Sequence, residues 1–171
     1  MLFYAVVTEL GRPKLAASML PGGAPLSLSM MALGDGGGAA VTPVANRASL
    51  VNERHRRAIN SVTAHPTDAE RVIVECVIPN TVGGWVIREF GLYDDGGDLV
   101  VYGNFPETYK PVLADGVGRD LTIRPHIYVG SDAEVTMLVD PSVTLATHQH
   151  VAAAIAAAFR ADRPFRYFRH F

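Results

Sequence analysis

The 171-residue sequence has a single cysteine, Cys76, which excludes a disulfide framework and a zinc site built from cysteines. It stands in the apolar run 72–78 and is expected to be buried and unreactive. Neither sign of charge dominates, since 15 lysines and arginines stand against 17 aspartates and glutamates. The chain as a whole therefore has no general attraction for nucleic acid or acidic lipid. No apolar run reaches the roughly 18 residues of a membrane-spanning helix, and no N-terminal leader pattern is present. These absences predict no nucleic-acid partner, no membrane insertion and synthesis in the cytoplasm.

Motifs for catalysis or metal binding are also missing. No serine lies in a Gly-x-Ser-x-Gly elbow. Asp94, Asp95 and Asp98 could form a calcium loop, but two glycines lie between them and no glutamate follows at the required spacing, which favours a turn. His148 and His150 are the metal candidates, because they would share one face of a strand. The surrounding alanines favour a helix, in which the two rings point apart. We therefore predict no catalytic residues, no metal and no cofactor.

Hydrophobic residues make up 49% of the chain, and the clearest structural signal lies in residues 83–111. A period of two places Val86, Arg88, Phe90 and Leu92 on one face of a strand and Ile87, Glu89, Gly91 and Tyr93 on the other. Residues 94–98 are rich in aspartate and glycine, which suit a tight turn, and 99–105 return as a second strand. This pattern predicts a β-hairpin.

Shorter segments predict the rest of an α+β fold that is mainly β and built from antiparallel hairpins. Further strands are expected at 2–8, 26–31, 58–63, 71–78, 120–129 and 135–139. Pro125 lacks an amide hydrogen, so its strand should lie at an edge or contain a bulge. Thr8 should cap a short N-terminal helix over 9–19, and Thr144 a C-terminal helix over 145–161. The glycine-rich stretch 34–38 is interpreted as a flexible connection, and 43–54 as a segment that wraps over the sheet or reaches a neighbour.

Three sets of residues are candidates for contact with partner proteins. Arginine pairs well with carboxylates, so the cluster around position 55 suits an acidic protein surface; it comprises Arg54, Arg56 and Arg57. The C-terminal helix has a narrow stripe suited to packing on another helix, formed by Leu145, His148, Ala152, Ile155 and Phe159. The last ten residues alternate arginine with aromatics, which are common interface anchors; they include Phe165, Arg166, Tyr167, Phe168 and Phe171.

Four stretches of the sequence together resemble a known family. They are MALGDGGG (31–38), LVNERHRRAIN (50–60), VIPNTVGGWVIREFGLYDDGGDLVVYGNFPETYKP (77–111) and VDPSVTLAT (139–147). This pattern is similar to the N-terminal domain of phage tail-collar tail-fibre proteins, found in contractile-tailed phages and R-type tailocins. The resemblance implies a homotrimeric structural protein of the virion tail, without catalysis, that joins a fibre to baseplate proteins.

Fibres of this family usually continue into a long shaft, whereas this sequence stops at Phe171. The chain is therefore expected to be an attachment module or an adaptor, whose tail contacts a separate distal fibre protein or a baseplate neighbour. Its expected divisions are a baseplate-attachment domain (1–142), a trimerising helix (143–161) and a docking tail (162–171). The alternative function is a carbohydrate-binding receptor module. Trp85 and Tyr93 could form its aromatic platform, although their place in the hairpin favours core packing.

Overall fold

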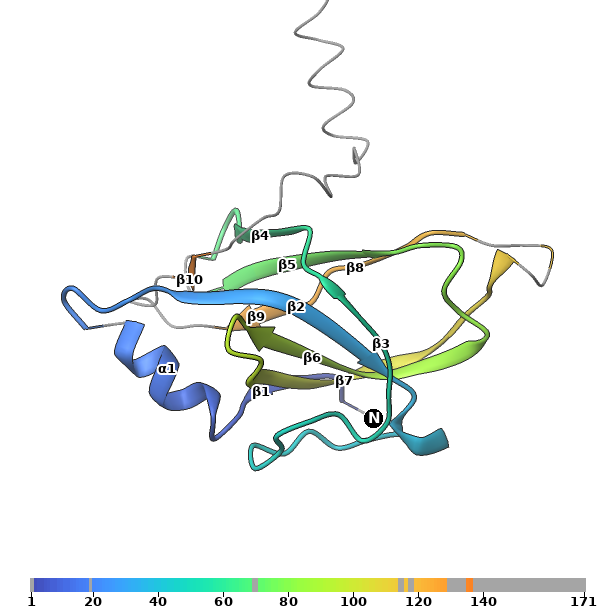
Figure 1. Ribbon diagram of the computed structural model, residues 1–171, viewed down its shortest axis with the longest axis horizontal. Coiled ribbons are helices and arrows are strands. Elements are labelled where there is room, and N and C mark those ends of the chain that lie inside the picture. The colour runs from blue at the N-terminus through green and yellow to red at the C-terminus, as the bar shows by residue number, and fades with distance from the viewer. Residues whose placement is uncertain are drawn as a thin grey trace, which may run out of the picture. The chain divides into compact units, whose positions relative to one another are not determined.

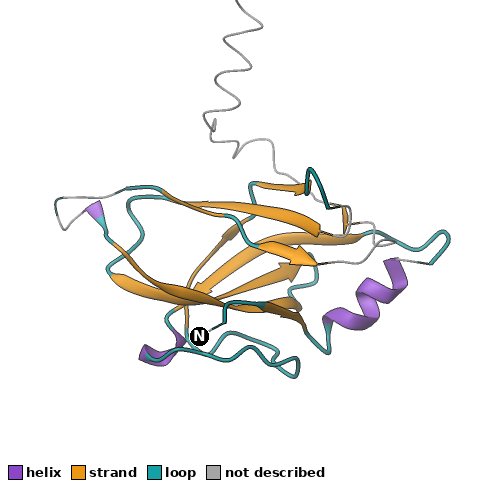
Figure 2. Ribbon diagram, turned by 180° about the vertical axis from the view of Figure 1, so that it is seen from behind, coloured by secondary structure: helices purple, strands orange, loops and turns teal. Residues whose placement is uncertain are grey.

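The computed structural model describes residues 2–18, 20–68, 71–113, 116 and 119–128, together with the backbone of 135–136. All of these lie within the first of two units, residues 1–140 and 141–171. The described part is mainly β, with one short α-helix and one 3-10 turn (Figures 1 and 2). The elements are β1 (Ala5–Val7), α1 (Gly11–Ser18), β2 (Leu26–Gly34), η1 (Gly36–Gly38), β3 (Glu53–Ala58), β4 (Ser61–Ala64), β5 (Arg71–Ile78), β6 (Trp85–Asp94), β7 (Leu99–Lys110), β8 (Leu121–Ile123), β9 (His126–Tyr128) and β10 (Val135–Thr136). The expected C-terminal helix lies outside the described residues.

The strands form two sheets. The larger has the order β1-β7-β6-β2, and the far side of β2 pairs with β3 near one end and β10 near the other. In the smaller sheet β5 pairs with β4 on one side and with β8 and β9 on the other. Every described pairing is antiparallel except that of β10 with β2. The hairpin predicted for residues 83–111 is confirmed as β6 and β7.

The side-chain faces of β6 differ from the prediction because the strand contains an irregularity, and β2 contains one too. In β6 the register shifts between Ile87 and Glu89, so Ile87 joins Phe90 and Leu92 in the core instead of lying opposite them. In β2 a shift between Leu28 and Met30 turns Met31 into the core. An extra residue on one strand reverses the alternation beyond it, which a simple period of two does not anticipate.

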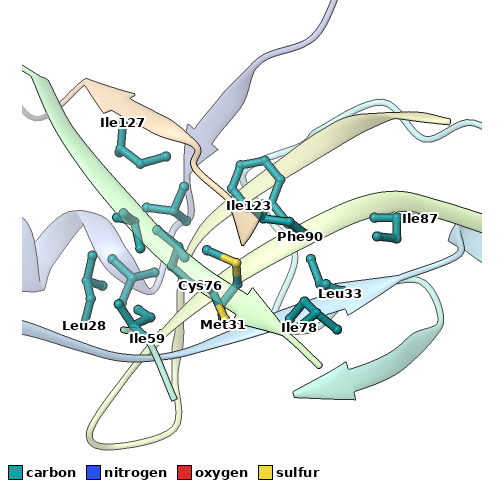
Figure 3. Packing of buried hydrophobic residues seen from close by; sticks show 14 of the residues in the cluster. Leu28, Met31, Leu33, Ile59, Cys76, Ile78, Ile87, Phe90, Ile123 and Ile127 are labelled. Atoms are coloured by element: carbon teal, nitrogen blue, oxygen red, sulfur yellow. The ribbon is translucent and has the colours of Figure 1, made fainter. Parts of the chain in front are cut away.

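The main hydrophobic core contains side chains from both sheets and is where they pack on each other (Figure 3). Its buried members are Leu26, Leu28, Met31, Leu33, Ile59, Val74, Cys76, Ile78, Ile87, Phe90, Leu92, Val100, Val101, Ile123 and Ile127. Burial raises the pKa of the Cys76 thiol to about 12. The prediction of a buried, unreactive cysteine is confirmed as far as its burial and its pKa are concerned.

A second, smaller cluster lies on the other side of the six-stranded sheet. The segment between η1 and β3 contributes Val41 and Leu50, which pack on sheet residues including Tyr93 and Tyr102. The segment therefore wraps over the sheet, which is one of the two outcomes that the sequence predicted for residues 43–54. Tyr93 is buried in this cluster, whereas Trp85 packs at the edge of the main core. The two aromatics belong to different clusters and form no shared exposed platform.

Two local features follow from hydrogen bonding. Thr8 caps α1, since its hydroxyl accepts from the amide of Gly11 at 3.0 Å. The helix begins at Gly11, two residues later than expected, and the amide of Glu9 donates to Ala45 O at 2.7 Å. Pro125 interrupts the predicted strand 120–129, leaving β8 and β9 on either side of it. It lies at an edge of the smaller sheet, as predicted, and its carbonyl accepts from the amide of Val74.

Candidate docking surface

A fully buried carboxylate, Glu89 of β6, attaches the wrapping segment to the sheet. Its Oε1 accepts from the amides of Asn52 at 2.9 Å and Gly36 at 3.3 Å. Its Oε2 accepts from the amide of Val51 at 2.9 Å and the hydroxyl of Tyr102 at 2.7 Å. Four donors replace the water that a charged group loses on burial. Burial, and then the hydrogen bond to Glu89, raise the pKa of Tyr102.

The glycine-rich stretch is a fixed turn and not the flexible connection expected. A side chain on Gly34 would lie 2.3 Å from Glu89 Oε1, and Gly36 has a φ of +65°, so both positions favour glycine. Asp35 accepts from the amide of Gly37 at 2.9 Å and from Asn52 Nδ2 at 2.8 Å. Because the amides of Gly36 and Gly37 already donate to carboxylates, they are not available to hold a phosphate.

Two of the three predicted interface arginines lie close to this turn. The guanidinium of Arg56 bonds both carboxylate oxygens of Glu53, at 2.9 and 2.7 Å, and lies 3.8 Å from the centre of the Tyr93 ring. Arg54 Nε is 3.7 Å from Asp35 Oδ2. Both arginines are exposed on β3, which the sequence had not predicted to be a strand. They form a surface with charge of both signs, fixed by contacts within the domain.

Arg57 does not belong to this surface. In the ladder with β2, Arg56 lies opposite Ala32 of the smaller cluster, whereas Arg57 lies opposite Met31 of the main core. Successive residues of a strand point to opposite faces, so the three arginines do not share one face of the sheet. Beyond Arg57 the chain crosses between the sheets. The predicted strand 58–63 is accordingly divided between the end of β3 and the start of β4.

The aspartate-rich turn after β6 is neutralised by a lysine from α1. Lys14 Nζ bonds the carboxylates of Asp94 and, at 2.6 Å, Asp98, while the amide of Asp98 donates to Asp94 Oδ1 at 2.9 Å. These hydrogen bonds raise the pKa of Lys14. Burial opposes ionisation of Asp94, but the hydrogen bonds from Lys14 and Asp98 lower its pKa overall. The turn prediction is confirmed, since the amide of Gly97 donates to Asp94 O at 3.0 Å and Gly97 has a φ of +81°.

A buried lysine, Lys110, holds several segments of the chain together at the other end of β7. Lys110 Nζ donates to the carbonyl oxygens of Pro79 at 3.2 Å, Pro111 at 3.3 Å and Arg119 at 2.6 Å. The side chain thereby joins the segments before β6, after β7 and before β8. Like Glu89, it is a buried charge satisfied mainly by backbone groups of the surrounding segments.

Comparison with known proteins assigns the family. The family model described as "Phage tail-collar fibre protein, N-terminal" matches residues 1–149. The chain belongs to this family. It is 42% identical over 154 residues to the "Probable tail fiber protein" of Escherichia phage P2, which covers 90% of this chain and 23% of the relative. The chain thus spans about a quarter of the length of that relative. No solved structure matches it.

Several predicted interface residues of this tail-collar fibre domain lie outside the described residues. They are the helix stripe Leu145, His148, Ala152, Ile155 and Phe159, the metal candidate His150, and the tail residues Phe165, Arg166, Tyr167, Phe168 and Phe171. Among the residues that the structure does describe, no group of three or more His, Cys, Asp or Glu side chains is placed to hold a metal. No helix in the same part of the chain is long and apolar enough to cross a membrane.

The sequence interpretation missed three polar residues that organise the tail-collar fibre domain. Glu89 and Lys110 each connect several segments, and Asn104 holds the N-terminal residues, as described below. Their only signal is a polar residue within a strand rich in apolar neighbours. A strand with one solvated face carries such residues routinely, so this signal did not distinguish them.

Proposed function

We propose that this chain is a non-catalytic structural protein of the phage tail that attaches a fibre to the baseplate. The observation that carries the proposal is the match of residues 1–149 to the N-terminal domain of tail-collar fibre proteins. The described side chains support it. Each buried charged residue is engaged inside the domain: Glu75 by Arg124, Glu89 by four donors, Asp94 by Lys14 and Lys110 by three carbonyls. Charged groups engaged in this way stabilise a fold.

The surface formed by β3 and the glycine turn suits contact with an acidic part of a baseplate protein. Arg54 Nε lies 3.7 Å from Asp35 Oδ2 and the Arg54 side chain remains half exposed, so its guanidinium can still pair with an incoming carboxylate. Arg56 is held flat against Tyr93, which reduces the side-chain entropy lost on binding. A fixed surface of this kind suits permanent attachment.

The remaining elements of the proposal concern assembly. Residues 143–161 form a helix that sets the threefold register of a homotrimer, and residues 162–171 contact the next component, a distal fibre protein or a baseplate neighbour. Light scattering of the full chain and of a chain ending at Asp140 tests this directly. A trimer that is lost only on truncation supports the proposal, whereas monomers in both cases contradict it.

Reconstitution tests attachment itself. Tail particles made without this chain are mixed with purified full-length chain and separated from unbound protein by sedimentation. We expect the chain to sediment with the particles, and an Arg54→Glu variant to bind at least tenfold less. An Arg71→Glu variant is the matched control, because Arg71 is an exposed strand arginine paired with Asp68 on the other sheet. Absence of the unaltered chain from the particles would contradict the function, and equal binding by both variants would contradict only the surface.

A further inference from the structure

Strands β3 and β1, at opposite edges of the six-stranded sheet, differ in charge. Four of the six residues of β3 are charged, which discourages another strand from adding to that edge. At the opposite edge, residues 2–7 read LFYAVV and contain no charged side chain. No strand in the described part of the chain pairs with the outer side of β1. This apolar edge lacks the protection that β3 has.

Backbone groups of β1 are available on that outer side. The amide of Asn104 donates to Tyr4 O at 3.2 Å, and the amide of Thr8 donates to Val100 O at 2.9 Å. Val6 lies opposite Tyr102 between these two pairs. Alternate residues of an antiparallel strand direct their amide and carbonyl to the same neighbour. The amides and carbonyls of the intervening Ala5 and Val7 therefore point away from β7.

Asn104 holds the residues before β1 in an extended conformation. Its Oδ1 accepts from the amide of Tyr4 at 2.8 Å, and its Nδ2 donates to Leu2 O at 3.0 Å. Asn104 itself is buried, at 4% exposure, yet the apolar side chains it positions are not. Leu2 is 78% exposed, Phe3 49% and Tyr4 39%. An ordered apolar segment in contact with water is typical of an interaction surface.

A hollow of about 200 Å³ opens beside this segment. The hollow lies between the β1 edge of one sheet and the β9 edge of the other. Its lining contains no lysine, arginine, aspartate or glutamate. Most of the lining residues are aromatic or proline, namely Phe3, Tyr4, Phe90, Phe105, Pro106 and Pro125. The ring of Phe90 lies over Gly103, where an added Cβ would be 2.3 Å from Phe90 Cε1. The hollow can receive a bulky apolar side chain.

We propose that β1 and this hollow bind an extended, uncharged segment of another tail protein as an additional strand. The segment pairs with the free amides and carbonyls of Ala5 and Val7 and places an apolar side chain in the hollow. Main-chain hydrogen bonds supply affinity in this mode of recognition, and the hollow supplies specificity. The inference rests on the proposed attachment function, of which it names a second contact surface distinct from β3.

Charge identifies the kind of occupant. Residues 162–171 of this chain carry three arginines and one aspartate, and β3 of a second copy carries three arginines and one glutamate. Either segment would bring charged side chains against an edge and a hollow that offer no carboxylate or ammonium partner, at a desolvation cost. A neutral strand incurs no such cost, so its apolar side chains match the surface. Strand β1 of a second copy is also neutral, but two β1 edges would pair about a twofold axis, which the threefold assembly proposed above does not contain. The occupant is therefore a neutral segment of another tail protein.

Two variants of the full chain test the edge in assembled particles. Ala5→Pro removes an outward amide while leaving the bonds to β7 in place, and Phe3→Lys adds a charge to the rim of the hollow. Leu20→Lys is the control, since Leu20 is exposed to a similar degree but lies in the loop after α1. We expect the amount of chain on purified particles, measured by quantitative mass spectrometry, to fall at least tenfold for the first two variants and to stay unchanged for the control.

Urea unfolding followed by the fluorescence of Trp85, the single tryptophan, establishes whether each variant is folded. If a variant unfolds, a photo-crosslinking benzoyl-phenylalanine at position 3 of the otherwise unaltered chain gives the decisive result. A crosslink to an uncharged segment of another tail protein supports the proposal. A crosslink to a second copy, to a charged segment or to nothing contradicts it. If the unaltered chain is absent from particles, the attachment function itself fails; if folded edge variants attach normally, only this inference fails.

Discussion

Replacing Glu89 tests whether a buried charge, and not apolar packing alone, holds the wrapping segment on the sheet. In Glu89→Gln one carboxylate oxygen becomes an amide nitrogen that cannot accept a hydrogen bond. If the nitrogen takes the Oε2 position, Tyr102 can turn its hydroxyl to accept, but the amide of Val51 loses its acceptor. The opposite orientation leaves the amides of Asn52 and Gly36 without one.

At least one buried amide is therefore unsatisfied, which costs about 1–3 kcal/mol. Glu89→Ala removes the acceptor of all four donors and leaves a cavity, so we expect a loss of about 3–5 kcal/mol, comparable with breaking a buried ion pair. Against a typical total of about 5–15 kcal/mol, the second value is a large fraction of the stability.

Urea unfolding at matched protein concentration gives these free energies, and amide hydrogen exchange shows where the structure loosens. Exchange should accelerate at Gly36, Val51 and Asn52 before it does in β6 and β7. Glu107→Gln is the matched control. Glu107 is an exposed carboxylate on β7 that pairs with Arg88, so its loss should change the free energy of unfolding by less than about 1 kcal/mol. Full stability of Glu89→Gln, with these three amides still protected, would refute the reasoning.

Three further predictions concern the other buried groups. Lys110→Met should lower the free energy of unfolding by about 2–4 kcal/mol in urea titrations, because it leaves three carbonyls without a donor. Cys76 should resist Ellman's reagent at pH 8 until the protein unfolds, since its pKa of about 12 leaves little thiolate; rapid labelling of folded protein would contradict its burial. The pKa of Asp94 is lower in the folded than in the unfolded chain, so its ionised form stabilises the fold above pH 3.8, and this contribution is lost as the pH falls through the folded-state value. Acid unfolding of Asp94→Asn should therefore depend less steeply on pH below 3.8 than that of the unaltered protein, and equal slopes would contradict the Lys14 contact.

The local pattern of the sequence predicted those features that depend on neighbouring residues. The β6–β7 hairpin follows from alternation on either side of a turn rich in aspartate and glycine, and Thr8 acts as a helix cap through a residue three positions away. Pro125 was expected at an edge or a bulge because it lacks an amide hydrogen, and it lies at an edge. Cys76 stands in an apolar run, and the core contains it.

Features that depend on distant parts of the chain were not predictable in the same way. Glu89 was assigned only to a strand face, because its partners Asn52 and Gly36 are 37 and 53 residues away. The bulges in β2 and β6 reverse the side-chain faces without changing the composition of either strand. The arginines around position 55 lie on two faces for a related reason, since a cluster in sequence is divided between two faces once the segment becomes a strand.

The free edge of β1 illustrates the same limit. The apolar character of residues 2–7 was visible and predicted a strand, but it equally suits a strand in the middle of a sheet. Only the order of strands shows that β1 is outermost, and only the contacts of Asn104 show that the residues before it are fixed. Composition alone could therefore not distinguish an exposed edge strand that binds a partner from a strand buried in the core.

Electron microscopy of tail particles from a strain that lacks this chain tests the central claim most directly. The account predicts assembled tails that carry no fibres, with fibres restored when the chain is supplied from a plasmid. Tails that carry their full set of fibres in its absence would contradict the claim that this chain attaches them.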